Sequence, residues 1–310
     1  LLLAPMLRVD KGDRIGLVGR NGAGKTTLSR VLAGESAPAS GGIKTTGTVG
    51  YLPQDPRTAD PDQLARSRVL SARGLDAVSL RMAKAAEALA MPGISAEEFD
   101  KSGERYNRAL DEFESLGGYT AESEAATIAA SIGLDERILS QPLGTLSGGQ
   151  RRRVELTRIL FSDADVLLLD EPTNHLDADS IRWLRKYLGA YEGGFIVISH
   201  DTELLEDTVN KVWHLDANRQ EIDLYSMGWK KYLLARETDE KRRKRERRNA
   251  QSQADTLRKQ AEKMRAKATK AKAAQSMFKR ADRILADTAT ELKKDNVAKL
   301  RFPTPKPCGR

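Results

Sequence analysis

The stretch Gly19–Thr26, "GRNGAGKT", decides the fold of this chain. It fits the pattern G-x-x-x-x-G-K-[ST], and it follows the apolar run "RIGLVG" at 14–19, which predicts a buried strand entering a loop. In such a loop, successive backbone N–H groups and the N-terminus of the next helix point at a bound anion. The motif in this setting therefore predicts an α/β fold with a phosphate-binding loop between a strand and a helix.

Each residue type in this loop has a physical task. Gly22 and Gly24 allow the backbone to wrap closely around a phosphate. Lys25 is predicted to reach the β- and γ-phosphates of a nucleotide, and Thr26 is predicted to offer its hydroxyl to Mg²⁺. Thr27, which follows in the helix, is a candidate for a further phosphate contact.

A second pair of glycines lies in Leu146–Gln150, "LSGGQ", ahead of the run "RRRVEL". Ser147 is predicted to cap a helix whose positive end presents N–H donors to an anion. The loop at Gly19–Thr26 is already the better phosphate cradle of the two. The sequence therefore raises the question of which phosphate, on which molecule, this second helix start binds.

Two continuous apolar runs, "DVLLLDEP" at 165–172 and "GFIVISH" at 194–200, end in polar residues. Such runs are typical of parallel strands that are buried on both faces of a sheet. The segment between them, "SIRWLRKYLGAY", has a helical pattern, so we expect a right-handed βαβ unit. The later runs "KVWHLD" and "EIDLYS" predict a closing pair of strands.

The polar ends of these strands supply candidate catalytic residues. Asp170, at a strand terminus, is placed to bind Mg²⁺ directly or through water, and the adjacent Glu171 is placed to polarise an attacking water. Gln54, at the end of the "GYLPQ" strand, is a candidate contact to Mg²⁺ or to that water. His200 is a candidate donor to the γ-phosphate, although a histidine at a strand end is more often structural.

Helical sequence is concentrated in two segments. Residues 62–142 are rich in Ala, Glu, Leu and Arg, and they predict several helices with breaks near 91–95 and 116–120. From Trp229 to Phe302 there is neither Gly nor Pro, which predicts a long helical segment. We expect this segment to fold back as a hairpin with its tip near 262–274. The thin apolar seam of that hairpin would consist of Leu257, Met264, Met277, Phe278, Ile284 and Leu285.

Charge separates the second helical segment from the rest of the chain. Residues 230–299 hold 23 Lys and Arg against 10 Asp and Glu, a net charge of +13, so the remaining residues carry −5 of the total of +8. This excess predicts a polyanionic partner, either nucleic acid or an anionic membrane surface. Aromatic residues are scarce there, which favours phosphate contacts over base stacking. A solvated helical face is the alternative interpretation of "KRRKRERR" at 241–248.

Composition sets the broad class of protein. No run of 18 apolar residues is present, so no transmembrane helix is encoded. The single cysteine, Cys308, cannot form an internal disulfide or a zinc cluster. The reducing cytoplasm is therefore the expected location.

Taken together, these motifs resemble the ATP-binding-cassette (ABC) ATPases over about residues 1–228, with a helical subdomain at about 62–160. The phosphate loop, Gln54, "LSGGQ", Asp170–Glu171 and His200 follow one another in the order of that family. The resemblance implies an ATPase with a mixed-sheet core, and ATP and Mg²⁺ as its cofactors. It also implies that "LSGGQ" closes over ATP bound to the phosphate loop of a second cassette, in the same full-length chain or in a homodimer. One cassette alone would then be catalytically incomplete.

The resemblance assigns site residues to three tasks. Those implied for ATP binding are Gly19, Asn21, Gly22, Ala23, Gly24, Lys25, Thr26, Thr27, Ser147, Gly148, Gly149 and Gln150. Those implied for catalysis are Glu171, His200 and Gln54, and those implied for the metal are Thr26, Gln54 and Asp170.

The closer resemblance is to the F subfamily, ABC-F, whose members lack membrane domains and act on ribosomes. It is carried by "DEPTNHLD" at 170–177 and by "MRAKATKAKAAQS" at 264–276, which is similar to the basic linker that contacts transfer RNA. The resemblance implies a basic helical linker at 229–296, contacts to the ribosome, tRNA or rRNA through 230–299, and no membrane partner. It further implies that a second cassette begins at 297–310. The first cassette would lack its opening strands and, with them, the residue that stacks on adenine.

Two other interpretations remain open from the sequence. One is the nucleotide-binding subunit of a transporter, against which the basic linker argues. The other is a non-catalytic module whose basic hairpin binds RNA. Within the F subfamily, the sequence does not distinguish a factor that regulates translation from a ribosomal-protection protein that gives antibiotic resistance.

Overall fold

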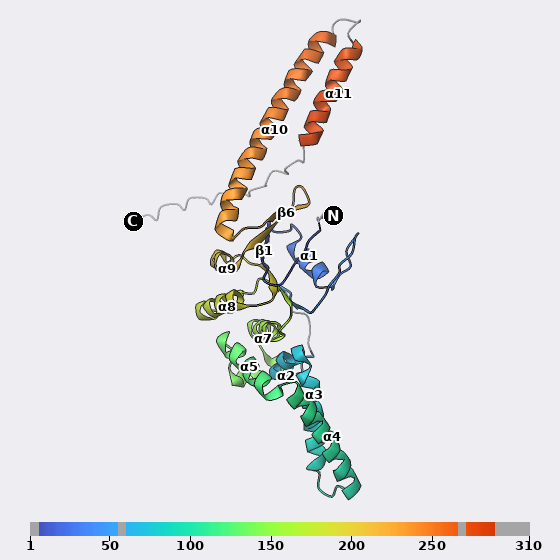
Figure 1. Cartoon of the computed structure of the whole chain (residues 1–310), viewed down its shortest axis with the longest axis vertical. Helices are drawn as coiled ribbons and strands as arrows, with labels where there is room; N and C mark the ends of the chain where they lie inside the picture. The colour runs from blue at the N-terminus through green and yellow to red at the C-terminus, as the bar shows by residue number, and fades with distance from the viewer. Residues whose placement is uncertain (1–5, 55–59, 266–270, 289–310) are drawn as a thin grey trace, which may run out of the picture. The chain divides into compact units, whose positions relative to one another are not determined.

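The structure is a computed structural model that describes residues 6–54, 60–265 and 271–288. The chain separates into two compact units, Leu1–Ala235 and Arg236–Arg310. The first unit contains a sheet with helices, and the second contains a helical hairpin (Figure 1). The predicted start of a second cassette, 297–310, lies outside the described residues.

The first unit is built on a six-stranded sheet with the order β2-β3-β4-β1-β5-β6. The strands are β1 (Arg14–Gly19), β2 (Val49–Leu52), β3 (Val166–Asp170), β4 (Gly194–Ile198), β5 (Lys211–Asp216) and β6 (Glu221–Tyr225). Neighbouring strands pair in parallel, except that β6 is antiparallel to β5. The predicted mixed sheet is therefore confirmed, and the carboxyl ends of its parallel strands meet at one edge, where ligands bind in open α/β sheets.

The predicted βαβ unit is present. Helix α8 (Ala178–Ala190) connects β3 to β4, and these two strands pair in parallel with Asp170 opposite Ile198. Asp177 caps α8 by accepting a hydrogen bond from the Ser180 N–H at 2.8 Å. The unit therefore fixes the polar end of β3 beside the polar end of β4.

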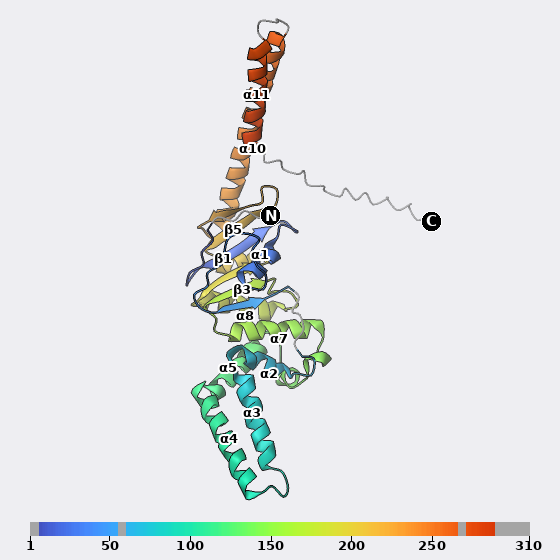
Figure 2. The ribbon, with the colours of Figure 1, turned by 90° about the vertical axis from the view of Figure 1, so that its right-hand side faces the viewer.

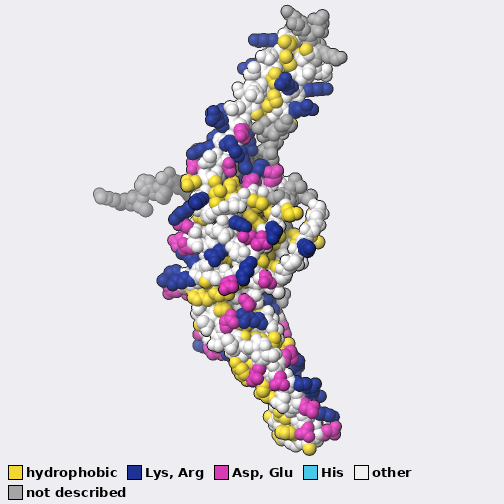
Figure 3. All heavy atoms as spheres, viewed as in Figure 1, with side chains coloured by type: hydrophobic (Ala, Val, Ile, Leu, Met, Phe, Trp, Pro, Cys, Tyr) yellow, Lys and Arg dark blue, Asp and Glu magenta, His cyan; other side chains and the backbone are white. Residues whose placement is uncertain are grey.

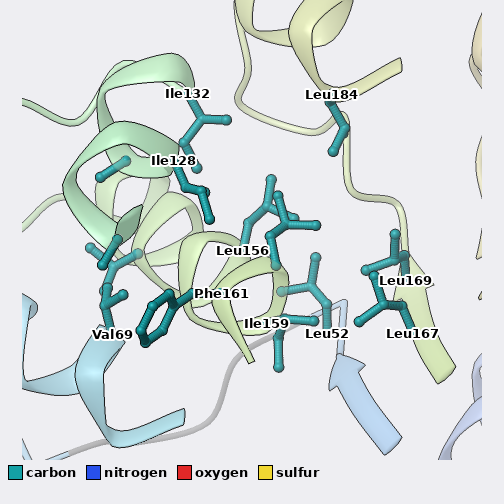
Figure 4. Close-up of a cluster of buried hydrophobic side chains, with 14 of the residues drawn as sticks. Leu52, Val69, Ile128, Ile132, Leu156, Ile159, Phe161, Leu167, Leu169 and Leu184 are labelled. Atoms are coloured by element: carbon teal, nitrogen blue, oxygen red, sulfur yellow. The ribbon is translucent and has the colours of Figure 1, made fainter. Parts of the chain in front are cut away.

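Side chains alternate between the two faces of the sheet, as the strand geometry requires. Leu167 and Leu169 of β3 belong to one buried cluster, and Leu168 belongs to the other. The first cluster is covered by α7 (Gly148–Phe161), α8 and α9 (Thr202–Thr208), and part of it is drawn in Figure 4. The second cluster lies under α1 (Lys25–Leu32). Both faces are buried, which explains the continuous apolar runs of these strands.

The helices before α7 follow the predicted breaks. Helix α3 ends at Leu89 and α4 begins at Ala96, so they flank the break at 91–95. Helix α4 ends at Ser115 and α5 begins at Gly118, inside the second predicted break at 116–120. The two longest, α3 and α4, lie side by side as a hairpin (Figure 2). The elements are α2 (Ala65–Leu70), the 3₁₀ turn η1 (Ser71–Arg73), α3 (Leu75–Leu89), α4 (Ala96–Ser115), α5 (Gly118–Ser131), α6 (Glu136–Leu139) and η2 (Leu143–Thr145).

The predicted basic hairpin is formed by α10 (Trp229–Arg265) and α11 (Ala271–Thr288). The connection at 266–270 lies within the interval predicted for the tip and outside the described residues. An ion pair joins the helices, with Arg258 Nη2 2.8 Å from Asp282 Oδ1. None of the helices in the described ranges is long and apolar enough to cross a membrane. Lys and Arg side chains are numerous along the hairpin in Figure 3.

The hairpin seam differs in one respect from the sequence expectation. Leu257, Met264, Met277, Phe278, Ile284 and Leu285 are only half-buried. The fully buried seam positions are alanines, at Ala254, Ala261, Ala274 and Ala281, which are at most 2% exposed. Small side chains at seven-residue spacing allow the two helices to approach closely, with the longer side chains flanking the contact.

Candidate functional site

A cavity of about 480 Å³ opens at the carboxyl edge of the sheet. It brings together the loop after β1, the start of α1 and the residues that follow β2, β3 and β4. Its lining consists of Asn21, Gly22, Gly24, Lys25, Thr26, Thr27, Gln54, Asp170, Glu171, Asn174, Ile198 and His200. Segments far apart in the sequence therefore converge on one site, as predicted from their positions at strand ends.

The loop after β1 depends on two glycines. Gly24 precedes α1 with a φ of 99°, a left-handed conformation that favours glycine, and no side chain caps the helix. Gly19 lies against β5, where an added Cβ would come within 2.7 Å of the Leu215 carbonyl oxygen. Gly19 and Ala23, both predicted to bind ATP, shape the loop but do not line the cavity. The first N–H groups of α1 face the cavity without a side-chain partner, which suits an anion.

Lys25 and Thr26 are held by hydrogen bonds within the site. Lys25 Nζ donates to the carbonyl oxygens of Gly19 at 2.8 Å and Arg20 at 3.1 Å. Thr26 Oγ1 donates to Asp170 Oδ2 at 2.7 Å. A hydroxyl and a carboxylate in contact are hard oxygen ligands of the kind that Mg²⁺ takes. No group of three or more His, Cys, Asp or Glu able to hold a metal occurs among the described residues, so a cation here would also need ligands from phosphate and water.

Burial dominates the electrostatics of the two acids after β3. It raises the pKa of Asp170, and the Thr26 hydrogen bond and the charges of Arg152 and Lys25 oppose that shift. It also raises the pKa of Glu171, opposed by the adjacent His200 and reinforced by the Asp170 charge. A carboxylate whose pKa moves toward neutrality is better matched to general-base work.

Glu171 has an unusual backbone. Its φ is 51°, in the left-handed region that side-chain-bearing residues rarely adopt, and its N–H donates to the Ile198 carbonyl at 2.8 Å. His175 in the same loop also has a positive φ, of 68°. Strained backbone of this kind concentrates at functional sites, and the surrounding contacts must hold it in place.

His200 and Gln54 lie at the mouth of the cavity. The His200 side chain is 73% exposed, and its Nε2 is 3.4 Å from Glu171 Oε1. The His200 backbone N–H also donates to Glu171 Oε2, at 3.3 Å. Gln54 is exposed and lines the cavity on the β2 side. His200 is therefore positioned to act on Glu171 as well as on a bound phosphate.

The "LSGGQ" residues are not part of this cavity. Ser147 Oγ accepts from the Gln150 N–H at 3.2 Å, and Gln150 Oε1 accepts from the Ser147 N–H at 2.8 Å, which completes a capping box at the start of α7. An added Cβ at Gly148 would meet nothing within 4 Å, and the φ of Gly148 is not positive. Nothing within the described chain therefore requires a glycine at position 148.

Three residues near the site were missed from sequence. Asn174 and Ile198 line the cavity. Arg152, on α7, is only 5% exposed and donates to backbone carbonyls on both sides of the site. Helical spacing could have revealed it, because Arg152 lies three, four and seven residues before positions on the buried face of α7. Those positions are Glu155, Leu156 and Ile159.

Comparisons with known proteins agree with this geometry. A family model described as "ABC transporter" matches residues 4–174, and a second model of the same description matches residues 215–302. The chain is 34% identical over 250 residues to the "Tylosin resistance ATP-binding protein TlrC" of Streptomyces fradiae, covering 77% of this chain and 44% of that protein. It is 36% identical over 211 residues to the "Energy-dependent translational throttle protein EttA" of Haemophilus influenzae, covering 66% and 36%.

The chain thus spans less than half the length of these two relatives. A solved structure described as "Structure of ATP binding subunit of ABC transporter" aligns with a TM-score of 0.51 at 18% identity, over 71% of this chain and 81% of that one. At that identity the likeness concerns the fold alone. The family match covers more than half of the chain, and it contains the phosphate loop, "LSGGQ" and both acids. The chain therefore belongs to the ATP-binding-cassette ATPases, and within them to the F subfamily, ABC-F.

Proposed function

We propose that this chain binds and hydrolyses ATP with Mg²⁺ in the cytoplasm, in partnership with a second cassette, and that it couples the reaction to the ribosome. The second cassette is supplied by the same full-length chain or by a second copy. The basic segment 230–299 is the part that contacts tRNA or rRNA. Two roles fall within this proposal, regulation of translation and antibiotic resistance, and they are supported by the relatives' names, a translational throttle and a tylosin resistance protein.

The contrast between the cavity and Gly148 carries the proposal. The cavity holds Lys25, Thr26, Asp170 and Glu171, which are the groups that phosphate, Mg²⁺ and an attacking water need. Gly148, the first residue of α7, is exposed and has open space around the position of an added Cβ. We infer that this open position at the start of α7 serves a ligand that approaches from outside the chain. That ligand is the γ-phosphate held by the partner cassette.

Each residue of the cavity then has a task in hydrolysis. The α1 N-terminus and Lys25 bind the phosphates, and Lys25 exchanges its hydrogen bonds with Gly19 and Arg20 for phosphate oxygens. Thr26 and Asp170 hold Mg²⁺, which neutralises charge on the phosphate oxygens. Glu171 orients the attacking water and accepts its proton.

His200 and Gln54 complete the site at its mouth. His200 is within reach of both Glu171 and the phosphate position, so it orients the carboxylate and donates to the γ-phosphate. Gln54 contacts Mg²⁺ or the attacking water. Ser147 to Gln150 perform the same anion-binding task for the partner's nucleotide through the start of α7.

Sedimentation with ribosomes tests the proposal. The Glu171→Gln variant binds ATP without hydrolysing it, so with ATP present it should pellet with ribosomes through a sucrose cushion. The double variant Glu171→Gln with Lys25→Ala lacks the phosphate contact and serves as the matched control, which should remain in the supernatant. If the Glu171→Gln variant stays off ribosomes with ATP, the ribosomal role is wrong. Co-purification with a membrane permease would instead favour a transporter subunit.

A charge-reversal pair tests the basic segment. Lys244→Glu, Arg245→Glu and Arg248→Glu change three exposed residues of α10. This triple variant should lose ATP-dependent pelleting, and the wild type should lose affinity by orders of magnitude between low and moderate salt. Reversal of three exposed lysines of the first unit, at 44, 84 and 186, is the control with the same change in net charge. Equal pelleting by both triple variants would contradict RNA contact through this segment.

A further inference from the structure

One side chain joins α7, the helix that begins within "LSGGQ" and is called the signature helix below, to the catalytic segments of its own cassette. Arg152 Nη1 donates to the Pro53 carbonyl at 2.7 Å and also to the Gln54 carbonyl. Its Nη2 donates to the carbonyls of Asp170 at 2.6 Å and Glu171 at 3.0 Å. One guanidinium therefore bridges the segment after β2 and the segment after β3.

The position of Arg152 on α7 makes this bridge sensitive to the helix start. Arg152 lies five residues after Ser147, so about 7.5 Å of helix separates the capping box from the guanidinium. The capping box fixes the first turn, and the buried face of α7 packs on the core cluster. A rotation or shift of the helix start therefore moves Arg152 as well, because no flexible loop separates the two.

The acceptors of Arg152 explain what such a movement would change. The four acceptors described above are backbone carbonyls, so these bonds fix the main chain at Gln54 and Glu171 and leave the side chains of both residues available for ligands. Glu171 has a φ of 51°, a conformation that needs support from its surroundings. The planar fork of an arginine, with five N–H donors, can reach two segments at once, and the single nitrogen of a lysine cannot.

We propose that Arg152 is a positioning residue that couples the two ATP sites of a cassette pair. A nucleotide engaged by Ser147–Gln150 sets the position of α7, and Arg152 passes that position to Gln54 and Glu171 in the cassette's own cavity. The cassette then hydrolyses its ATP only when its signature helix has closed on the partner's ATP. This inference rests on the proposed function, because it requires ATP hydrolysis by paired cassettes.

The test compares two neighbouring arginines in the protein assembled with its second cassette. Arg152→Lys keeps the charge and the stem, so the variant should fold and bind a fluorescent ATP analogue within about twofold of the wild type, while kcat falls about tenfold or more. Arg152→Gln should lower kcat further at similar affinity. Arg151→Gln changes the adjacent exposed arginine and should keep the wild-type kcat. A folded Arg152→Lys variant with wild-type kcat overturns the proposal.

A double-mutant cycle separates coupling from local support. Because Ser147→Ala and Arg152→Lys act along one path, the double variant should be about as slow as the slower single variant. If the two losses multiply, Arg152 supports Glu171 independently of the helix start, and the coupling is refuted. A wild-type assembly that does not hydrolyse ATP would instead refute the proposed function.

Discussion

Two helices of the cassette begin at glycine-rich turns, and their first turns are satisfied in different ways. Helix α1 follows Gly24, has no side-chain cap and opens into the cavity with Asp170 and Glu171. Helix α7 follows Ser147, has a complete capping box and lies outside that cavity. A helix start without a cap leaves its N–H groups for a ligand, whereas a capped start is already stable by itself.

The glycines of the two turns also differ, in whether their own backbone conformation requires a glycine. Gly24 is required by its own backbone, because its φ of 99° is unfavourable for any residue with a Cβ. Gly148 has an ordinary backbone and open space. The first turn is therefore adapted to a ligand held within the chain. In the proposed pairing of two cassettes, the second turn would receive a molecule that approaches from outside the chain.

The largest expected effect tests whether the α1 cavity is the reaction site. Glu171→Gln keeps the shape of the side chain but removes the base, so kcat for phosphate release should fall about a thousandfold while ATP still binds. Glu192→Gln, which alters an exposed carboxylate paired with Lys11, is the control and should keep the wild-type rate. Hydrolysis at the wild-type rate by the Glu171→Gln variant would remove the chemical distinction between the two helix starts.

The second largest expected effect is on the affinity for ATP, which tests whether the turn before α1 is the main ATP contact of the chain. Lys25→Ala removes a charged donor to the phosphates and should weaken ATP binding about 10- to 100-fold in equilibrium titration. The exposed Lys11→Ala change serves as its control for lost positive charge. An unchanged dissociation constant for Lys25→Ala would mean that the chain's principal ATP contact lies elsewhere.

The stability of α7 should depend on a charge network beyond its first turn. Burial alone would raise the pKa of Glu155, but the hydrogen bond from Arg68 and the charge of Arg158 outweigh it and hold the pKa below its ordinary value. Arg68 Nε is 2.6 Å and Arg158 Nε is 2.8 Å from the carboxylate. A depressed pKa contributes stability that is present above the unfolded value of about 4.3 and is lost as the pH falls through the folded value.

Glu155→Gln should therefore lower the free energy of unfolding at pH 7 by about 2 kcal/mol, discounted for the partial exposure of both arginines. In urea titrations, the difference from the wild type should begin to shrink as the pH falls below the unfolded-state pKa of about 4.3, because the unfolded chain then takes up the proton first. The difference should disappear below the depressed folded-state pKa, where the native carboxyl is protonated as well. Glu97→Gln, in an exposed pair with Lys101, is the control and should change little. A constant difference at all pH values would show that charge is not what holds α7.

The substitution with the smallest expected effect on stability, Gly148→Ala, tests the turn before α7 most directly. Gly148→Ala should leave the stability of the isolated chain unchanged or raise it by about 0.5 kcal/mol, because the helical backbone accepts a Cβ there. In the assembly with a second cassette, the same methyl group should lower kcat about tenfold by obstructing the partner's phosphate. Gly24→Ala should have the opposite effect on stability and destabilise the isolated chain, because the φ of Gly24 is positive. Full activity of the Gly148→Ala assembly would contradict a ligand at α7.

Local patterns in the sequence predicted the elements well. Apolar period, glycine position or charge predicted the phosphate loop, the two apolar strands, the breaks around α4 and the hairpin of α10 and α11. The strand predicted at 194–200 ends at Ile198, so His200 lies just beyond it. These features depend on residues that are close together in the chain, so they can be predicted from a single sequence.

Features that depend on distant contacts were not predictable in the same way. The sheet places β1 between β4 and β5, an order that no local pattern specifies. The left-handed backbone of Glu171 is imposed by its surroundings, because glutamate has no preference for it. Arg152 lies in a run of three arginines, and only the packing of α7 shows which of them is buried.

The alanine seam of the basic hairpin limits how its length can change. Ala254 and Ala261 are seven residues apart, as are Ala274 and Ala281, and all four are buried. Inserting or deleting one or two residues in one helix would rotate its small side chains by about 100° or 200° off the contact. Whole heptads, added to both helices together, would preserve the seam. Homologous hairpins of this design should therefore differ in reach by steps of about 10 Å, two helical turns at a time.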